Sequence, residues 1–144
     1  HIYQALLERT LKGWLDPFLA IDPKGDPITE LSKYISTKMD LSFESPLASR
    51  LFAMEVLNGA PQLKAALSTN LREIVDDKAR IIRVWMDQGK LRQTDPHHLI
   101  FSIWSVTQHY ADFGVQIEAL LGAPPDRSFA KESVVNILLR GLKP

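Results

Sequence analysis

An indole and a carboxamide lie one helical turn apart in this sequence, at Trp104 and Gln108. Residues four apart on a helix share a face, so these two side chains would project side by side. A buried glutamine needs partners for its acceptor oxygen and its N–H donors, which a purely apolar core does not offer. Two interpretations stay open at this point. Either Trp104 stacks on a flat ligand whose polar edge Gln108 reads, or Trp104 fills the core and Gln108 bonds a neighbouring helix.

Few other residues have the types and spacing for acid–base or metal chemistry. Adjacent His97 and His98 point about 100° apart on a helix, so they cannot converge on one ion without distant partners, and we interpret them as solvated residues. His109 and Asp112 are three apart, and we interpret them as a polar pair at a helix–helix contact rather than an acid–base or metal site. The acidic residues within 73–77 are expected to face solvent. The sequence thus predicts no catalytic residue, no metal site and no cofactor.

Sequence motifs and cysteine content exclude further classes of chemistry. The chain lacks a G-x-S-x-G elbow, a phosphate-binding glycine loop and an H-E-x-x-H pair. It has no cysteine, which excludes disulfide scaffolds, thiolate zinc sites and thiol nucleophiles. Nothing in the sequence demands catalysis.

The composition of the 144 residues fits one globular domain, with 45% apolar and 24% charged residues. Seventeen basic residues balance seventeen acidic ones. A domain that binds nucleic acid by itself usually carries a basic stripe, because phosphate contacts dominate that affinity. Direct DNA binding by these residues is therefore disfavoured. No apolar run approaches the roughly 20 residues of a membrane span, and no leader is visible, so we expect no membrane contact and a cytoplasmic location.

Apolar residues recur at steps of three and four, which predicts an all-α bundle of six to seven helices. Aspartate or serine followed by proline marks helix starts at Asp26, Ser45 and Asp95, and glycine marks helix ends at Gly59 and Gly89. The predicted helices span 2–19, from 27 past 39, 46–57, roughly 61–88 with a weak point at 68–70, 96 to at least 113, and a closing segment after 125.

The predicted helix that begins after Asp95 is apolar on two faces, so it must be covered on several sides, including by another subunit. Its third face is small and polar. We predict that this side forms a dimer seam together with the final helix, because small serines permit close approach of two helices. The seam residues are predicted to be Ser102, Ser105, Val106, His109 and Phe113.

Several stretches of the sequence resemble the C-terminal domains of tetracycline-repressor-type transcriptional regulators, and in particular of those that respond to pyrimidines. The turn Gly89-Lys90-Leu91 followed by Asp95-Pro96 resembles the family as a whole. The run Thr107-Gln108-His109-Tyr110-Ala111-Asp112-Phe113 is the most specific part, since a generic bundle does not require these residues in that order. The resemblance extends over essentially all 144 residues. Further matching stretches are Trp14-Leu15 with Pro17, Ser49-Arg50-Leu51-Phe52, Asn58-Gly59-Ala60-Pro61 and His98-Leu99-Ile100-Phe101.

This resemblance implies a fold, an assembly and a ligand. Residues 1–144 would form the effector-binding and dimerisation domain, with a homodimer formed through the last two long helices. Operator DNA would be read by an N-terminal helix-turn-helix domain that these residues do not include. The effector would be a uracil-like pyrimidine, and the family's pocket residues would fall at Trp14, Trp104 and Gln108. The loop at 22–27, the break at 123–127 and Ser32 depart from the family's pattern, so the class of ligand is better supported than its identity.

Two other functions remain compatible with the residues. One is a small-molecule enzyme of all-α fold that uses His109 and Asp112 as an acid–base pair. The other is a structural dimerisation module without a ligand, which predicts that Trp104 and Gln108 lie in a filled core with no cavity beside them.

Overall fold

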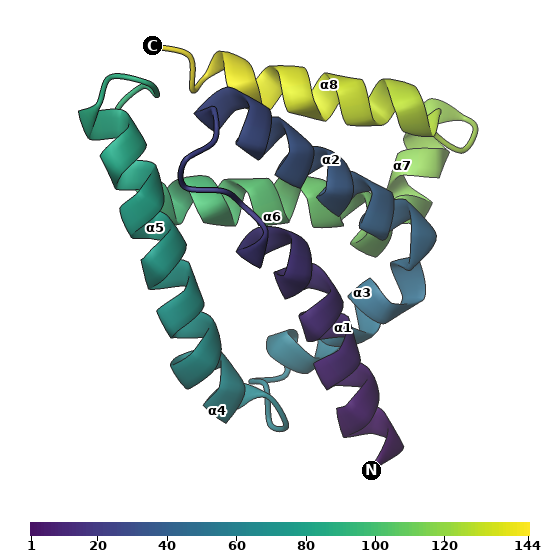
Figure 1. The fold of residues 1–144 in the computed structure, drawn as a ribbon. Coiled ribbons are helices and arrows are strands. Elements are labelled where there is room, and N and C mark those ends of the chain that lie inside the picture. The colour runs from purple at the N-terminus through teal and green to yellow at the C-terminus, as the bar shows by residue number, and fades with distance from the viewer.

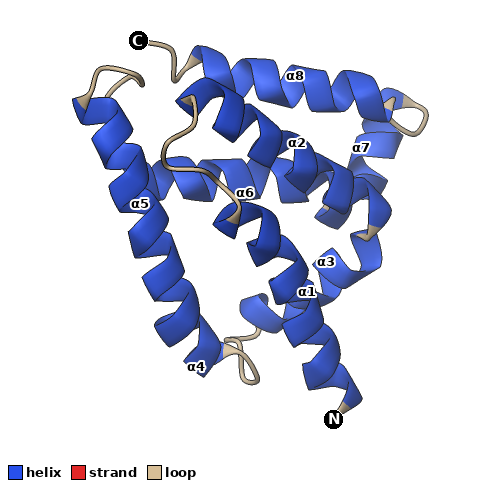
Figure 2. Ribbon diagram, in the orientation of Figure 1, coloured by secondary structure: helices blue, strands red, loops and turns tan.

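A computed structural model describes residues 1–144, and every regular element in it is helical (Figures 1 and 2). Counting the continuous run from Lys64 to Asp87 as one, the chain forms seven helices, so the predicted all-α class and helix number are confirmed. The elements are α1 (Ile2–Leu19), α2 (Pro27–Glu44), α3 (Pro46–Leu57), α4 (Lys64–Ala66), the π-helical turn η1 (Leu67–Leu71), α5 (Arg72–Asp87), α6 (Pro96–Asp112), α7 (Gly114–Leu121) and α8 (Arg127–Arg140).

Side-chain caps and left-handed residues set most helix ends where the sequence predicted them. The carboxylate of Asp26 accepts from the backbone N–H of Thr29, and Asp95 does the same for His98 at the start of α6. Gly59 and Gly89 adopt positive φ angles of 90° and 72°, which a side chain would disfavour. Ser45 is the exception: it precedes Pro46 at the start of α3, but its side chain makes no capping hydrogen bond.

The long helical run differs from the prediction at its start and in its middle. Helical structure begins at Lys64 rather than near residue 61, because the backbone N–H groups of Gln62 and Leu63 donate to the Glu55 carboxylate instead. The hydroxyls of Ser68 and Thr69 both bond the carbonyl of Ala65. Such bonds compete with the helix ladder, and the predicted weak point at 68–70 is a π-helical turn rather than a break.

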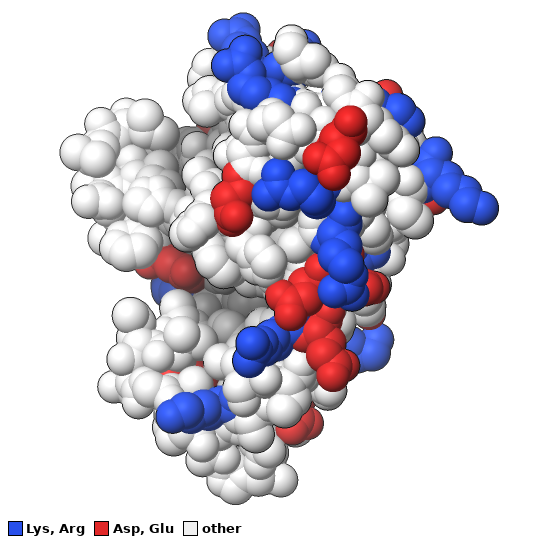
Figure 3. All heavy atoms as spheres, turned by 90° about the vertical axis from the view of Figure 1, so that its left-hand side faces the viewer, with Lys and Arg blue, Asp and Glu red and all other residues white.

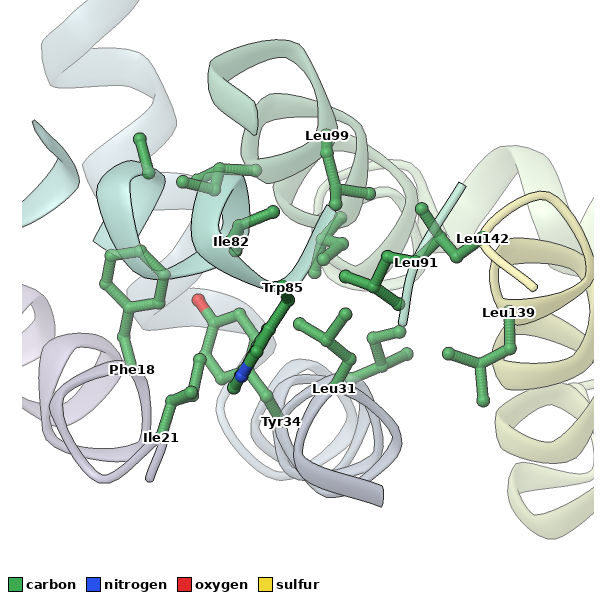
Figure 4. Packing of buried hydrophobic residues seen from close by; sticks show 14 of the residues in the cluster. Phe18, Ile21, Leu31, Tyr34, Ile82, Trp85, Leu91, Leu99, Leu139 and Leu142 are labelled. Carbon is green, nitrogen blue, oxygen red and sulfur yellow. The ribbon is translucent and has the colours of Figure 1, made fainter. Parts of the chain in front are cut away.

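Helix α2 lies at the centre of the bundle, in contact with α1, α3, α6 and α8 (Figure 1). The main core surrounds the buried indole of Trp85, whose Nε1 donates to the carbonyl of Pro23 at 3.2 Å. Figure 4 shows Leu31 and Tyr34 from α2 on one side of Trp85, and Leu139 and Leu142 at the far end of the core. This core fixes α2 against α5, α6 and α8.

A second, smaller core lies between α1, α3 and the segment before α4. Its buried members are Leu7, Phe52, Ala60 and Leu63, and Trp14 packs against it. Trp104 and Tyr34 belong to the main core or its margin. The boundary between the two cores therefore runs between Trp14 and Trp104, and it is here that the packing leaves space.

Charged side chains are mixed in sign on the face that carries α5, where acidic and basic groups are interspersed in one band (Figure 3). This face shows no continuous basic stripe of the kind that binds phosphates. No helix combines the length and the apolar character that crossing a membrane requires.

Candidate functional site

A partly enclosed cavity of about 70 Å³ lies at the boundary of the two cores. A cavity needs about 10–15 Å³ of such volume to hold one water molecule, so this cavity has room for several waters or for one small ring. Trp14, Trp104 and Gln108, the three predicted ligand-binding residues, all line it. The remaining lining residues are Leu11, Leu15, Tyr34, Lys38, Phe52 and Leu71.

Trp14 is held on the α1 side of the cavity by contacts to two other helices. Its ring packs edge-on against Phe52 of α3, with ring centroids 4.7 Å apart. The Lys38 ammonium of α2 lies 4.5 Å from the centroid of the indole ring. A molecule beside Trp14 would therefore also meet this ammonium.

Trp104 lines the cavity from α6, where that helix packs against α2. Its indole N–H donates to the hydroxyl oxygen of Tyr34 at 2.7 Å, and its ring packs edge-on against Phe18 at 5.7 Å. Burial raises the pKa of Tyr34 well above its usual value, so the phenol stays protonated. Because its oxygen already accepts from Trp104, its own proton is available to a further acceptor.

Gln108 lies one turn after Trp104 and is half-buried. Its carboxamide makes no hydrogen bond to the protein, and no fully buried polar side-chain atom in the chain lacks a partner. The amide is therefore free to bond another molecule, and Gln108 lines the cavity. The structural-module alternative required a filled core beside Trp104 and Gln108, and on this point it is wrong.

Lys38, the one charged lining residue, is among the cavity residues that the sequence analysis missed. The residue is only 2% exposed, and burial lowers the pKa of its ammonium to about 8 against the opposing attraction of Asp112. Its position contained a signal: Lys38 follows Tyr34 by four residues and precedes Met39, so it lies on the buried stripe of α2. Ser32, a departure from the family pattern, does not line the cavity.

The histidine and acidic candidates do not form a reactive site. His109 and Asp112 make no hydrogen bond to each other, so the predicted polar pair is wrong. Instead Asp112 accepts from the Ser49 hydroxyl at 2.6 Å, and the His109 ring stacks on Phe113 at 4.9 Å. His97 contacts Asp76 at 2.9 Å on the half-exposed surface. No group of three potential metal ligands occurs in the chain.

The five predicted seam residues share the outer side of α6. Ser102, Ser105, His109 and Phe113 are exposed in the single chain, and Val106 is half-buried against the main core. The hydroxyls of Ser102 and Ser105 bond carbonyls of their own helix, so another helix can approach without stranding them. Large apolar side chains are also exposed nearby in the sequence, at Val115, Leu120, Leu121, Phe129 and Ile137.

Comparisons with known proteins give one consistent result. The family model described as YcdC-like protein, C-terminal region, matches residues 7–144. The HTH-type transcriptional regulator RutR of Escherichia coli O157:H7 is 42% identical over 147 residues, which cover 99% of this chain and 69% of the relative. The regulators of the same name from Escherichia coli K12 and Shigella flexneri match with the same identity and coverage.

Proposed function

This chain belongs to the YcdC-like C-terminal-region family of TetR-type transcriptional regulators, and on that premise we propose that its cavity senses a uracil-like pyrimidine. The relatives are transcriptional regulators rather than enzymes. The observation that carries the proposal is the meeting of Trp14, Trp104 and the unpartnered carboxamide of Gln108 in one cavity.

The chemistry of the lining residues suits such a ring. Uracil is flat and neutral, and its imide edge alternates a carbonyl acceptor with an N–H donor. A carboxamide offers the complementary pair in one plane, as asparagine and glutamine do for adenine. The two indoles supply apolar contact surface. A ring without the imide edge would leave Gln108 unpaired, so the site would select against it.

We also propose that the domain is a homodimer that uses the Ser102, Ser105, Val106, His109 and Phe113 side of α6 together with α8. The exposure of these residues and the internal hydrogen bonds of the two serines support this assembly. Aromatic residues are enriched in protein interfaces, and Phe113 with the stacked His109 offers such a contact.

Operator DNA, in this proposal, is contacted by an N-terminal helix-turn-helix domain and not by residues 1–144. Helix α1 would connect that domain to the cavity, because it carries Trp14 in the lining. The same helix is tied to α3 at its start, where the Tyr3 hydroxyl donates to Glu55 at 2.9 Å. A ligand that favours one placement of α1 would change the spacing of the two DNA-binding heads. Shifting such a balance from 1:99 to 99:1 takes about 5.5 kcal/mol of differential binding.

A thermal-shift screen followed by calorimetry tests the proposed ligand class. The panel contains uracil, thymine, their ring-saturated forms, ring-opened derivatives, and adenine as a purine control. We expect saturable binding, without turnover, of the planar oxo-pyrimidines at one site per chain. Adenine should not bind, because its two fused rings exceed a cavity with room for one small ring. Failure of every pyrimidine to bind the folded protein would overturn the proposal, and product formation would favour the enzyme alternative.

A further inference from the structure

The Lys38 ammonium is the one charged group among the nine residues that line the cavity. It is almost completely buried, yet it forms no hydrogen bond and no ion pair within 4 Å. No fully buried side-chain nitrogen in the chain lacks a partner, so the Lys38 nitrogen keeps some accessible surface, and Lys38 is one of the residues that line the cavity. A buried cation without a paired anion is unfavourable unless something supplies an acceptor.

The protein offers this ammonium only partial compensation. The Trp14 ring provides a cation–π contact at 4.5 Å. Asp112 of α6 attracts the charge, but its carboxylate is already bonded by Ser49. From α2 itself Tyr34 lines the cavity, while α1, α3 and η1 contribute only apolar side chains and the indole. The ammonium therefore has hydrogen-bond donors that remain free for a ligand in the cavity.

We propose that Lys38 is a specificity-determining residue whose ammonium binds an oxygen acceptor on the ligand, so that the cavity selects planar rings with a carbonyl, enolate or carboxylate oxygen at this position. This inference rests on the proposed function of the same cavity. Lys38 and Gln108 then recognise different groups of the ligand. Gln108 pairs with an edge that carries a donor and an acceptor, and Lys38 binds an oxygen. Rings whose oxygen is negatively charged gain most, because charge-assisted hydrogen bonds are stronger than neutral ones.

Lys38→Met removes the charge but keeps most of the length and apolar contact of the side chain. Lys33→Met is the matched control, since Lys33 is on the same helix but its side chain is 70% exposed. Removal of an unpaired buried charge should leave the unfolding temperature of Lys38→Met equal to or above that of the parent. A lysine that served only the fold would instead lower it.

Calorimetry on the parent and both variants should use uracil, the anionic ring barbiturate, and the non-pyrimidine acids benzoate and nicotinate. We expect Lys38→Met to weaken uracil about tenfold and barbiturate up to about 150-fold, and Lys33→Met to weaken neither. Binding should also raise the pKa of Lys38. At pH 8 about half of the Lys38 side chains in the free parent carry a proton, so binding should take up at most about half a proton per chain. Titrations in buffers of different ionisation enthalpy measure this uptake. Lys38→Met should take up none.

The possible outcomes separate this inference from the proposed function. Equal uracil and barbiturate affinities for the parent and Lys38→Met would overturn the role of Lys38 and leave pyrimidine sensing intact. Binding of benzoate or nicotinate that depends on Lys38, without any pyrimidine binding, would overturn the pyrimidine proposal and support Lys38. Absence of binding by every ring to the folded parent would overturn both.

Discussion

The indole N–H of Trp104 donates to the hydroxyl of Tyr34 across the α6–α2 contact, at 2.7 Å. This bond satisfies the indole and fixes its orientation at the edge of the main core, while Trp14, which packs against the second core, lines the same cavity. Two indoles from different cores thus face one small space. In the proposed function, a ligand between these indoles would act on the relative position of the two cores.

Removal of the Tyr34 hydroxyl should destabilise the domain because it leaves the Trp104 N–H without a partner. We expect Tyr34→Phe to lower the free energy of unfolding by about 1–3 kcal/mol, measured by urea denaturation. Tyr110→Phe is the control, since no hydrogen bond links the Tyr110 hydroxyl to another side chain. An unchanged stability of Tyr34→Phe would mean that water satisfies the indole equally well.

Gln108→Ala should weaken uracil binding without unfolding the domain, because the carboxamide makes no bond within the protein. The expected loss is about 1–3 kcal/mol, or about five- to 150-fold in affinity by calorimetry. Gln116→Ala, on the exposed surface of α7, provides a control with the same change. Equal affinity of the parent and Gln108→Ala for uracil and thymine would remove Gln108 from the site.

Local signals predicted the helices well because helix ends depend on neighbouring residues. Asp26 and Asp95 cap the helices that they precede, and α1 spans the predicted 2–19. The start at Lys64 was missed because it depends on Glu55, a buried carboxylate that reaches Gln62 and Leu63 from another helix. Contacts of this kind between distant segments leave no periodic pattern in the sequence.

The cavity could be predicted only in part for the same reason. Trp104 and Gln108 share a helix face, so their spacing indicated a joint role. Trp14 was assigned through the family resemblance alone, since nothing in α1 distinguishes it from a core residue. Lys38 was missed because a lysine is normally solvated, and its burial appears only when α1 and α6 close over α2.

Ser105→Arg should dissociate the proposed homodimer, because it places a bulky charge in a seam that would have to desolvate it. Sedimentation of the parent at micromolar concentration should show a dimer, and the variant should sediment as a monomer. Gln88→Arg, at the exposed end of α5, adds the same side chain elsewhere. A variant that dimerises as tightly as the parent would place the seam on another face.

Residues 1–144 should not bind duplex DNA selectively. Their net charge is zero, and the face of α5 mixes acidic and basic groups. Fluorescence anisotropy with labelled duplexes should give only weak binding that is lost between 50 and 200 mM salt, as for non-specific phosphate contacts. Tight, sequence-selective binding by these residues would contradict the proposal that operator DNA is contacted by an N-terminal domain and not by residues 1–144.

The stability of the ligand-free domain should rise with pH between about 7.5 and 9.5 through Lys38. Burial lowers the pKa of Lys38 from 10.5 to about 8 in the folded chain, so the unfolded chain binds more protons in this window. The free energy of unfolding therefore increases with pH, by at most about 2 kcal/mol across this window out of about 3 kcal/mol for the whole shift. Lys78 also has a lowered pKa, and Tyr34 a raised one that opposes the trend above about pH 10. Both residues are retained in Lys38→Met, so the difference between parent and variant isolates Lys38.

We expect Lys38→Met to be the more stable protein at pH 7.5 and this advantage to shrink by pH 9.5 in urea denaturation. A constant difference across the window would show that Lys38 keeps its proton in the folded domain.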